Sequence, residues 1–264
     1  MSTKIRLATF NLENLDDTSG RGPTLAQRIA VMRPQLERLE ADILCLQEVN
    51  GQEQSGQPRQ LLALEELISG TAYEDYNIVS TKTSDGVQVY DKRNLVILSH
   101  FDIAEHQQYK HSFLHAPAYR KATALPEEDD ADKITWERPI LYTKLKLGLD
   151  TVVHVINLHL KSRLASSIPG QQLSSFTWKS AAGWAEGFFV SSMKRVGQAL
   201  ETRILIDSIF DENNNARIAV CGDFNAESLE VPVEAIRGSV ENTGNAGLGK
   251  RVMVPCEHTI PESL

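Results

Sequence analysis

Apolar positions along the first part of the chain alternate between short runs and helical spacing. Residues 5–10 and 42–46 are mainly apolar segments of the length of a strand. Two helices are predicted between and after them, from apolar residues three or four positions apart at Leu25, Ile29, Met32, Leu36 and Leu39, and again at Leu61, Leu64, Leu67 and Ile68. Pro34 predicts a kink or an early end in the first helix. Strand, helix, strand, helix is the order in which many α/β domains begin.

After residue 76 the pattern changes, and strand-like segments follow one another with few helices between them. They cover residues 76–80, 95–99, 140–145, 151–160 and 218–221, which predicts sheets with antiparallel pairs. A helix is expected near residues 190–210, and the five carboxylates of residues 126–132 predict a solvated loop. Because no repeat or low-complexity linker interrupts the chain, we predict one α/β domain over residues 1–264.

Composition narrows the class of protein. The net charge of -8 argues against a uniformly basic surface, so nucleic-acid binding would need a local patch. The count of three cysteines is odd, and Cys45 and Cys221 lie in apolar strand segments, which favours buried thiols in a reducing compartment. The N-terminus lacks an apolar signal segment, and no apolar run approaches the roughly 20 residues that span a bilayer. We therefore expect a cytoplasmic protein without integral membrane association.

Polar residues follow four of the predicted strands, at the point where each strand ends. These motifs are Thr9-Phe10-Asn11, Leu46-Gln47-Glu48, Asn157-Leu158-His159 and Gly222-Asp223-Phe224-Asn225. Because side chains alternate across a strand, we expect the first and third residues of each three-residue motif to share a face of the strand. We expect the same of Asp223 and Asn225. Such a sheet edge suits an oxygen-ligated metal and a charged oxyanion.

Each of these residue types has a chemical use and a structural alternative. Glu48 is the leading candidate ligand for a hard cation such as Mg²⁺, although a strand-end carboxylate can also be merely solvated. Asn11 adds a neutral oxygen or two hydrogen-bond donors. His159 can donate to a phosphate oxygen or move a proton, or serve as a structural histidine. Asp223 can orient a water, and Asn225 can hold a phosphate oxygen without adding negative charge.

Taken together, four motifs resemble those of the endonuclease/exonuclease/phosphatase family in their order and approximate separation. They are Phe10-Asn11, Leu46-Gln47-Glu48-Val49, Asn157-Leu158-His159-Leu160-Lys161-Ser162 and Gly222-Asp223-Phe224-Asn225. The resemblance implies a four-layer α/β sandwich of two packed mixed sheets flanked by helices. It also implies hydrolysis of phosphoester bonds by in-line attack of water, dependent on Mg²⁺ (or Mn²⁺).

The same resemblance implies a role for each motif residue. Glu48 is expected to be the metal ligand with Asn11 its neighbour, His159 to contact the scissile phosphate, and Asp223 to activate or orient the water. Asn225 is expected to position the phosphate, and we also predict substrate binding by Asn157.

The chain departs from the family pattern in one respect. Family members usually close with a strand that ends in Asp-His, and this sequence has no such dipeptide; the nearest candidates are Glu105-His106 and Glu257-His258. We therefore expect a missing closing strand, and weak or absent turnover by these 264 residues. The alternative function is a noncatalytic member of the family that serves as a binding scaffold.

Residues 161–203 combine basic and aromatic side chains. Six basic residues interleave with Phe176, Trp178, Trp184, Phe188 and Phe189. This combination suits the stacking of bases and pairing with phosphates, or contact with a lipid surface; alternatively the aromatic residues pack on the core. The substrate class stays open among nucleic acid, a lipid or sugar phosphate and a small phosphodiester, with nucleic acid favoured. The sequence predicts no oligomeric state.

Overall fold

The computed structural model describes residues 4–17, 22–148 and 151–256. The chain divides into two compact units, each assembled from three separate segments. The first unit comprises Met1–Tyr109, Arg138–His159 and Ala216–Asp223, and the second comprises Lys110–Glu137, Leu160–Asn215 and Phe224–Leu264. All eight strands of the two main sheets belong to the first unit.

The first sheet has the order β1-β2-β6-β5 and is mixed. Its strands are β1 (Leu7–Leu15), β2 (Ile43–Val49), β5 (Asn77–Ser80) and β6 (Asn94–Ser99). The first two strands are parallel, and β6 is antiparallel to both of its neighbours. A hairpin of β3 (Gln52–Gln54) and β4 (Gln57–Gln60) follows β2.

The second sheet has the order β14-β11-β10-β7 and is mixed as well. Its strands are β7 (Asp102–Tyr109), β10 (Ile140–Lys146), β11 (Val152–His159) and β14 (Ile218–Asp223). Strand β11 is parallel to β14 and antiparallel to β10. Each sheet thus contains one parallel pair, β1 with β2 and β11 with β14, and these four strands carry the polar motifs of the sequence.

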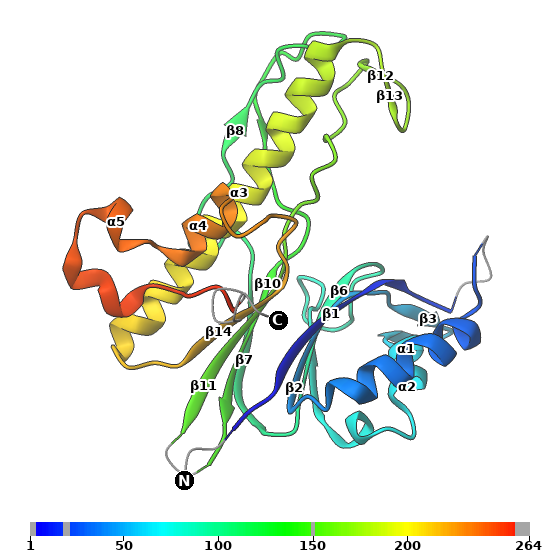
Figure 1. Ribbon diagram of the computed structural model, residues 1–264. Coiled ribbons are helices and arrows are strands. Elements are labelled where there is room, and N and C mark those ends of the chain that lie inside the picture. Colours follow the sequence, from blue (N-terminus) through cyan, green and yellow to red (C-terminus); the bar gives the residue numbers. More distant parts are fainter. Residues whose placement is uncertain (1–3, 18–21, 149–150, 257–264) are drawn as a thin grey trace, which may run out of the picture. The chain divides into compact units, whose positions relative to one another are not determined.

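Helices α1 (Leu25–Leu39) and α2 (Leu62–Ile68) cover the outer face of the first sheet, as Figure 1 shows. Thr24 begins α1 through a capping box with Gln27, which satisfies backbone N–H groups at the helix start. The helix continues through Pro34, so the predicted early end does not occur. Ile29 and Leu36, on either side of this proline, both pack into the core beneath the helix.

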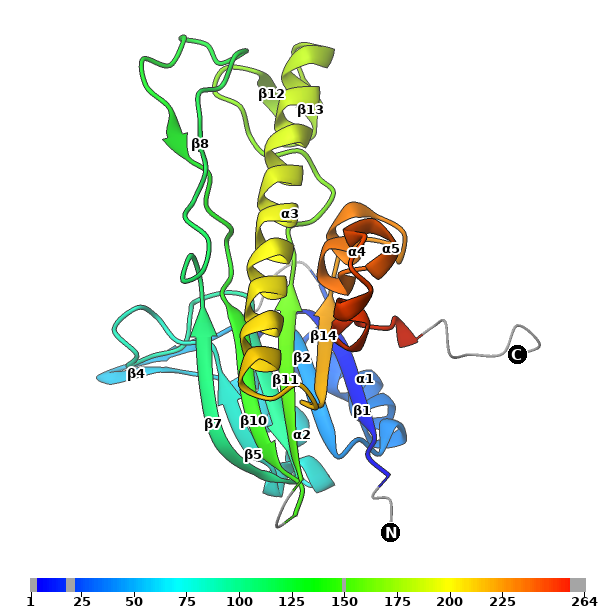
Figure 2. The same cartoon turned by 90° about the vertical axis from the view of Figure 1, so that its left-hand side faces the viewer.

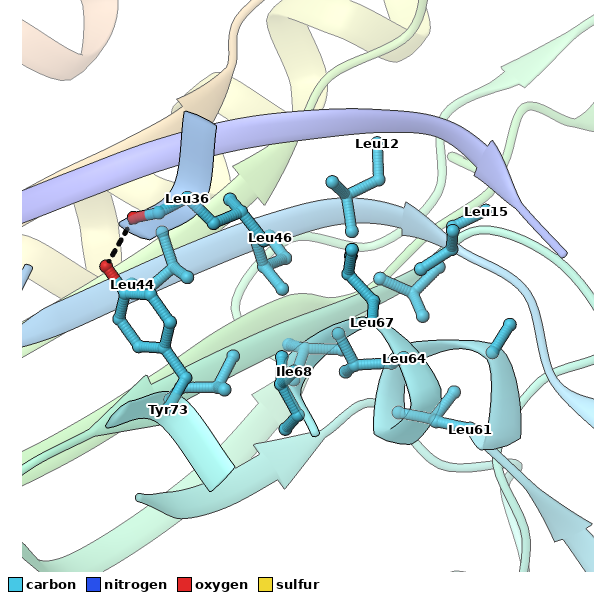
Figure 3. Close-up of a cluster of buried hydrophobic side chains, with 14 of the residues drawn as sticks. Leu12, Leu15, Leu36, Leu44, Leu46, Leu61, Leu64, Leu67, Ile68 and Tyr73 are labelled. Atoms are coloured by element: carbon cyan, nitrogen blue, oxygen red, sulfur yellow. Dashed lines mark hydrogen bonds between the residues drawn. The ribbon is translucent and has the colours of Figure 1, made fainter. Parts of the chain in front are cut away.

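Two apolar cores separate the three layers of the first unit. The outer core lies between the helices and the first sheet (Figure 3), where the Tyr73 hydroxyl of the 3-10 helix η1 (Ala72–Asp75) donates to the Leu36 carbonyl oxygen at 2.8 Å. The inner core lies between the sheets and includes Cys45 and Cys221, both buried as predicted. Two mixed sheets with helices confirm the predicted α/β fold class.

The second unit is built around one long helix, α3 (Ala181–Glu212), as Figure 2 shows. It also contains two helices, a 3-10 helix and two short β pairs: α4 (Val231–Arg237), α5 (Val240–Thr243), η2 (Ala246–Arg251), β8 (Ala118–Tyr119) with β9 (Asp132–Lys133), and β12 (Gln172–Ser174) with β13 (Thr177–Trp178). In the described part of the chain no helix combines the length and the apolar character needed to cross a membrane.

Two buried glutamates on α3 hold the segment Lys110–Glu137 against this helix. Glu201 is fully buried and accepts from the backbone N–H groups of His111, Ser112 and Phe113 and from the Trp136 indole N–H. Glu186 accepts from the Tyr119 hydroxyl and from further donors in the same segment. These hydrogen bonds add to the apolar contacts that Ala124 and Ile134 of the same segment make with Val190 of α3.

Candidate active site

Four polar side chains come together in the first unit, three from the ends of β2, β11 and β14 and one from the middle of β1. Asn11 is the fifth of the nine residues of β1, so the prediction that this strand ends at Asn11 is wrong. Nε2 of His159 lies 3.5 Å from Oε1 of Glu48 and 3.5 Å from Oδ2 of Asp223. Nδ2 of Asn11 donates to the same two oxygens, at 3.4 Å to Glu48 and 3.0 Å to Asp223. Asn11 and Glu48 come from the first sheet and His159 and Asp223 from the second, so the cluster joins both sheets.

The two parallel pairs explain why these residues meet. Asn11 is in register with Gln47 on the neighbouring strand, and His159 is in register with Asp223. Because parallel strands run in the same direction, their carboxyl ends reach the same edge of a sheet. The imidazole of His159 is 3 % exposed, whereas the side chains of Glu48 and Asp223 are 16 % and 30 % exposed. Solvent therefore reaches the cluster from the side of the carboxylates.

Glu48 does not follow the regular alternation that we expected from its strand. Its φ angle of 60° lies in the left-handed region, and the register between β2 and its neighbours shifts before Val49. Leu46 consequently packs in the core below the helices, while Glu48 contacts Asn11 and lies within 3.5 Å of His159. The prediction that Leu46 and Glu48 share one face is wrong, because this local backbone turn reorients the carboxylate.

Gly222 permits the close approach of β14 to β11 directly before Asp223. Its φ angle is 130°, and a Cβ atom at this position would lie 2.0 Å from the carbonyl oxygen of Leu158. Any other residue would force the strands apart at this point. The glycine of the Gly-Asp-Phe-Asn motif is thus required by strand packing.

Behind the cluster, a buried hydrogen-bond network links the two sheets. The Gln47 amide nitrogen donates to Oδ1 of Asn157 at 2.7 Å and to Oγ1 of Thr9 at 3.1 Å. The Asn157 amide nitrogen donates to the carbonyl oxygens of Leu46 and Val96, at 3.0 Å and 2.9 Å. Asn157 is fully buried and bonds across the two sheets, while the predicted substrate binding by Asn157 stays a prediction. Sequence reasoning included Gln47 in a motif but assigned it no role.

Replacing Asn157 by alanine is expected to lower the free energy of unfolding by about 2–3 kcal/mol. The substitution leaves two backbone carbonyl groups and the Gln47 amide short of their buried partners. Urea denaturation followed by circular dichroism measures this change. Asn77→Ala is the matched control, because Asn77 is an exposed asparagine on the first sheet. A loss below about 0.5 kcal/mol would show that the network has no structural importance.

Asn225 belongs to the second unit. It has a φ angle of 48°, and its amide nitrogen donates to the carbonyl oxygen of Leu160 at 3.0 Å. Its own carbonyl oxygen accepts from Nε of Arg163 at 3.3 Å. A left-handed asparagine held on both sides is a well-defined feature of the loop after β14, while the predicted contact of Asn225 with phosphate stays a prediction.

Of the two substitutes considered for the family's closing Asp-His pair, the one that the structure describes is not part of the cluster. Glu105 and His106 are in β7, which is separated from β11 by β10 in the sheet. His258 lies outside the described residues. A different basic group adjoins the cluster: Arg138, 9 % exposed, donates from Nη1 to the carbonyl oxygen of His159 at 3.3 Å. It brings a permanent positive charge to the end of β11, and nothing in the sequence pattern indicated it.

The donor set of the cluster fits a hard divalent cation. Two carboxylates, Glu48 and Asp223, converge on the same two nitrogen atoms, which concentrates negative charge at one point. Within the described residues no group of three or more His, Cys, Asp or Glu side chains is arranged to hold a metal ion. Mg²⁺ commonly binds through one or two carboxylates and keeps several waters, so one or two of these oxygens would suffice.

Asn11 suits a supporting position better than a ligand position in this geometry. Its oxygen already accepts from the backbone N–H of Glu13 at 2.9 Å, while its nitrogen faces the two carboxylates. An amide binds a cation through oxygen, so direct ligation would require Oδ1 to use its second lone pair or the amide to turn over. The geometry describes Asn11 as the donor that fixes both carboxylates.

A comparison with protein-family models identifies the group to which the sequence belongs. Residues 8–240 match the model of the endonuclease/exonuclease/phosphatase family. The chain belongs to this family. All four polar motifs lie inside the matched region, so the resemblance inferred from them is confirmed. Members of the endonuclease/exonuclease/phosphatase family are generally phosphoesterases or nucleases. No curated protein matches the sequence.

Solved structures of the endonuclease/exonuclease/phosphatase family share the fold at low sequence identity. A family protein from Bacteroides thetaiotaomicron is 16% identical with a TM-score of 0.51, over 88% of this chain and 66% of that one. A β-hairpin deletion mutant of β toxin from Staphylococcus aureus is 14% identical with a TM-score of 0.51, over 89% of this chain and 74% of that one. This chain thus spans about two thirds to three quarters of their length, and the likeness supports the fold alone.

Proposed function

We propose that the protein hydrolyses phosphoester bonds at the cluster of Asn11, Glu48, His159 and Asp223, with the help of Mg²⁺ or Mn²⁺. The observation that carries the proposal is the convergence of two carboxylates on one imidazole nitrogen, each at 3.5 Å, from strands of two different sheets. Membership of the endonuclease/exonuclease/phosphatase family supports the same reaction class. A fold kept only as a scaffold has no need to gather these charged groups at one edge.

Each residue has a role that follows from its environment. Glu48 would hold the cation through a carboxylate oxygen, beside Asn11. When bound, the cation neutralises negative charge that develops on the reacting phosphate. Asp223 is the more exposed carboxylate, and it orients the attacking water and accepts its proton. His159 donates from Nε2 to a phosphate oxygen, and the water attacks in line with the leaving oxygen.

The remaining parts of the proposal come from the motifs and the composition. Asn225, two residues after Asp223, is proposed to hold a non-bridging phosphate oxygen. Nucleic acid is the first substrate class to test, followed by lipid or sugar phosphates and small phosphodiesters. A cytoplasmic location is proposed because all three cysteines are free thiols, as a reducing compartment requires.

Removal of divalent cations is expected to abolish hydrolysis. The protein is treated with EDTA, dialysed, and assayed with bis(p-nitrophenyl) phosphate and with a DNA oligonucleotide while Mg²⁺ or Mn²⁺ is added back. The turnover, expected to be weak for these 264 residues, should return with the cation, and calorimetry should record heat from cation binding. Hydrolysis that persists in EDTA would contradict the metal-dependent mechanism. If neither turnover nor binding heat is observed, the scaffold alternative replaces the enzyme.

A further inference from the structure

Residues 164–192 of the second unit expose an unusual number of large apolar side chains. We call six of them the apolar tip: Leu164 (65% exposed), Leu173 (67%), Phe176 (83%), Trp184 (48%), Phe188 (40%) and Phe189 (48%). Single exposed apolar residues are ordinary on protein surfaces, whereas contiguous apolar patches mark binding surfaces. Within this segment the rings of Trp184 and Phe188 are in contact. The prediction that these aromatic residues pack on the core holds for Trp178, which packs beside Val190, and in part for Phe189, whose ring packs edge-on against Tyr119.

The apolar tip is presented on ordered elements. Phe176 stands in the turn between β12 and β13, where Oγ of Ser174 donates to Oγ1 of Thr177 at 2.9 Å. Trp184 and Phe188 are one helical turn apart on α3, and their rings stack at a centroid distance of 5.6 Å. The hairpin lies beside the N-terminal part of α3 in both views (Figures 1 and 2).

The other faces of this part of α3 are already covered by the rest of the unit. Gly183 and Gly187 lie against the part of the chain that precedes α3. A Cβ atom on Gly187 would be 2.3 Å from the carbonyl oxygen of Ser166, and one on Gly183 would meet the side chain of Gln171. Glu186 faces the segment Lys110–Glu137 and accepts a hydrogen bond from the Tyr119 hydroxyl. Trp184 and Phe188 therefore occupy the face that remains open to solvent.

The basic residues of the same region mostly bond within the unit. Arg195 is buried and donates to the carbonyl oxygens of Lys161 and Ser162. Arg203 pairs with Asp207, and Arg163 pairs with Glu230. A surface that binds nucleic acid needs these cations directed at phosphates, so their inward use argues against that partner.

The apolar tip itself carries almost no charge. Between residues 164 and 192 the charged residues are Lys179 and Glu186, and because Glu186 is buried, Lys179 is the exposed one. The acidic loop 126–132 approaches this segment where the Leu125 N–H donates to the Pro169 carbonyl oxygen. Three of its five carboxylates pair with cations: Glu127 with Arg120, and Glu128 and Asp132 with Lys121.

We propose that the apolar tip docks onto the surface of a lipid bilayer with zwitterionic headgroups. An exposed hairpin turn that contains Phe176 needs no preformed groove in its partner, because a fluid lipid interface adapts to its shape. Trp and Phe are the side chains favoured at this interface, and a nearly uncharged tip matches a surface without net charge. The proposal goes beyond the hydrolysis proposed above and does not depend on it.

Vesicle binding of the full chain tests the proposal directly. The 264-residue protein is sedimented with phosphatidylcholine vesicles, and the bound fraction gives the partition constant. The wild type is expected to bind, with little change between low and high salt. In the double variant Phe176→Ser, Trp184→Ser, we expect each substitution to lower the partition constant by about tenfold or more relative to the wild type. Leu229→Ser is the matched control, because Leu229 is 80% exposed in the same unit but outside the tip.

Several outcomes would overturn the proposal. They include wild-type protein that fails to bind the vesicles, or a double variant that binds as well as the control. Binding to single-stranded DNA in place of vesicles, with a steep fall in salt, would identify a nucleic-acid surface. A concentration-dependent dimer, measured by light scattering and lost in the double variant without lipid binding, would identify a second copy as the partner. Because vesicle binding is measured without substrate, failure of the proposed hydrolysis would leave this result unaffected.

Discussion

Replacing Glu48 by glutamine is expected to weaken Mn²⁺ binding at least about tenfold and to lower metal-dependent hydrolysis on the order of 10²-fold. The substitution keeps the size of the side chain but removes the negative charge that would bind the cation. It also changes the cluster in which Glu48 Oε1 accepts from Asn11 Nδ2 and lies 3.5 Å from Nε2 of His159. Calorimetric titration with Mn²⁺ measures binding independently of turnover.

Glu53→Gln provides the control for this experiment. Glu53 is a carboxylate five residues further along the chain, its side chain is 79% exposed, and it pairs with Arg59 away from the cluster. Its replacement should leave Mn²⁺ affinity and hydrolysis within about twofold of the parent protein. If Glu48→Gln behaves like Glu53→Gln in both measurements, Glu48 is not the metal ligand and the cluster has another purpose.

Replacing Glu201 by alanine is expected to destabilise the second unit by about 3–5 kcal/mol. The change leaves three backbone N–H groups, those of His111, Ser112 and Phe113, and the Trp136 indole N–H without their buried acceptor. Denaturation followed by tryptophan fluorescence is a suitable measurement, because Trp136 is buried against His111. The centroids of the two rings are 3.7 Å apart.

Glu212→Ala serves as the comparison for the substitution of Glu201. Glu212 is an exposed glutamate at the end of the same helix, so its removal should change the free energy of unfolding by no more than about 0.5 kcal/mol. Equal stability of the two variants would show that the hydrogen bonds to Glu201 contribute little net free energy.

The sequence predicted the elements whose apolar residues face a core. Strands β2, β6, β10 and β11 are almost entirely buried, and their apolar runs made them recognisable. The four polar motifs also stood out, since a polar residue after an apolar run has few structural explanations. The meeting of Asn11, Glu48, His159 and Asp223 then follows from the pairing of parallel strands.

Other elements gave no such signal. Strand β7, Asp102–Tyr109, is mostly exposed, and its polar sequence shows no apolar alternation. Helix α3 begins at Ala181, nine residues before the start we predicted, because its first turns pack through glycines and a buried glutamate as well as through apolar residues. The left-handed backbone of Glu48 is set by strand packing, and a pattern of residue types carries no information on it.

The buried network around Asn157 shows a further limit of prediction from sequence. Asn157 and His159 are two residues apart and share a motif, yet one bonds across the sheets and the other faces the carboxylates. A polar residue at a strand end is compatible with either position. The assignment of His159 to the candidate site comes from the distances of its Nε2 to the carboxylates of Glu48 and Asp223, which only the structure provides.

The separation of the cluster's residues along the chain has a consequence for biosynthesis. Asn11 and Asp223, which share a hydrogen bond, are 212 positions apart. A nascent polypeptide that has formed only β1 and β2 holds Asn11 and Glu48 but neither of their partners from the other sheet. Because Asn11 and Asp223 close so long a loop, the cluster cannot be complete until the polypeptide extends to Asp223. Competence for chemistry would then arrive as one of the last events in the maturation of the molecule.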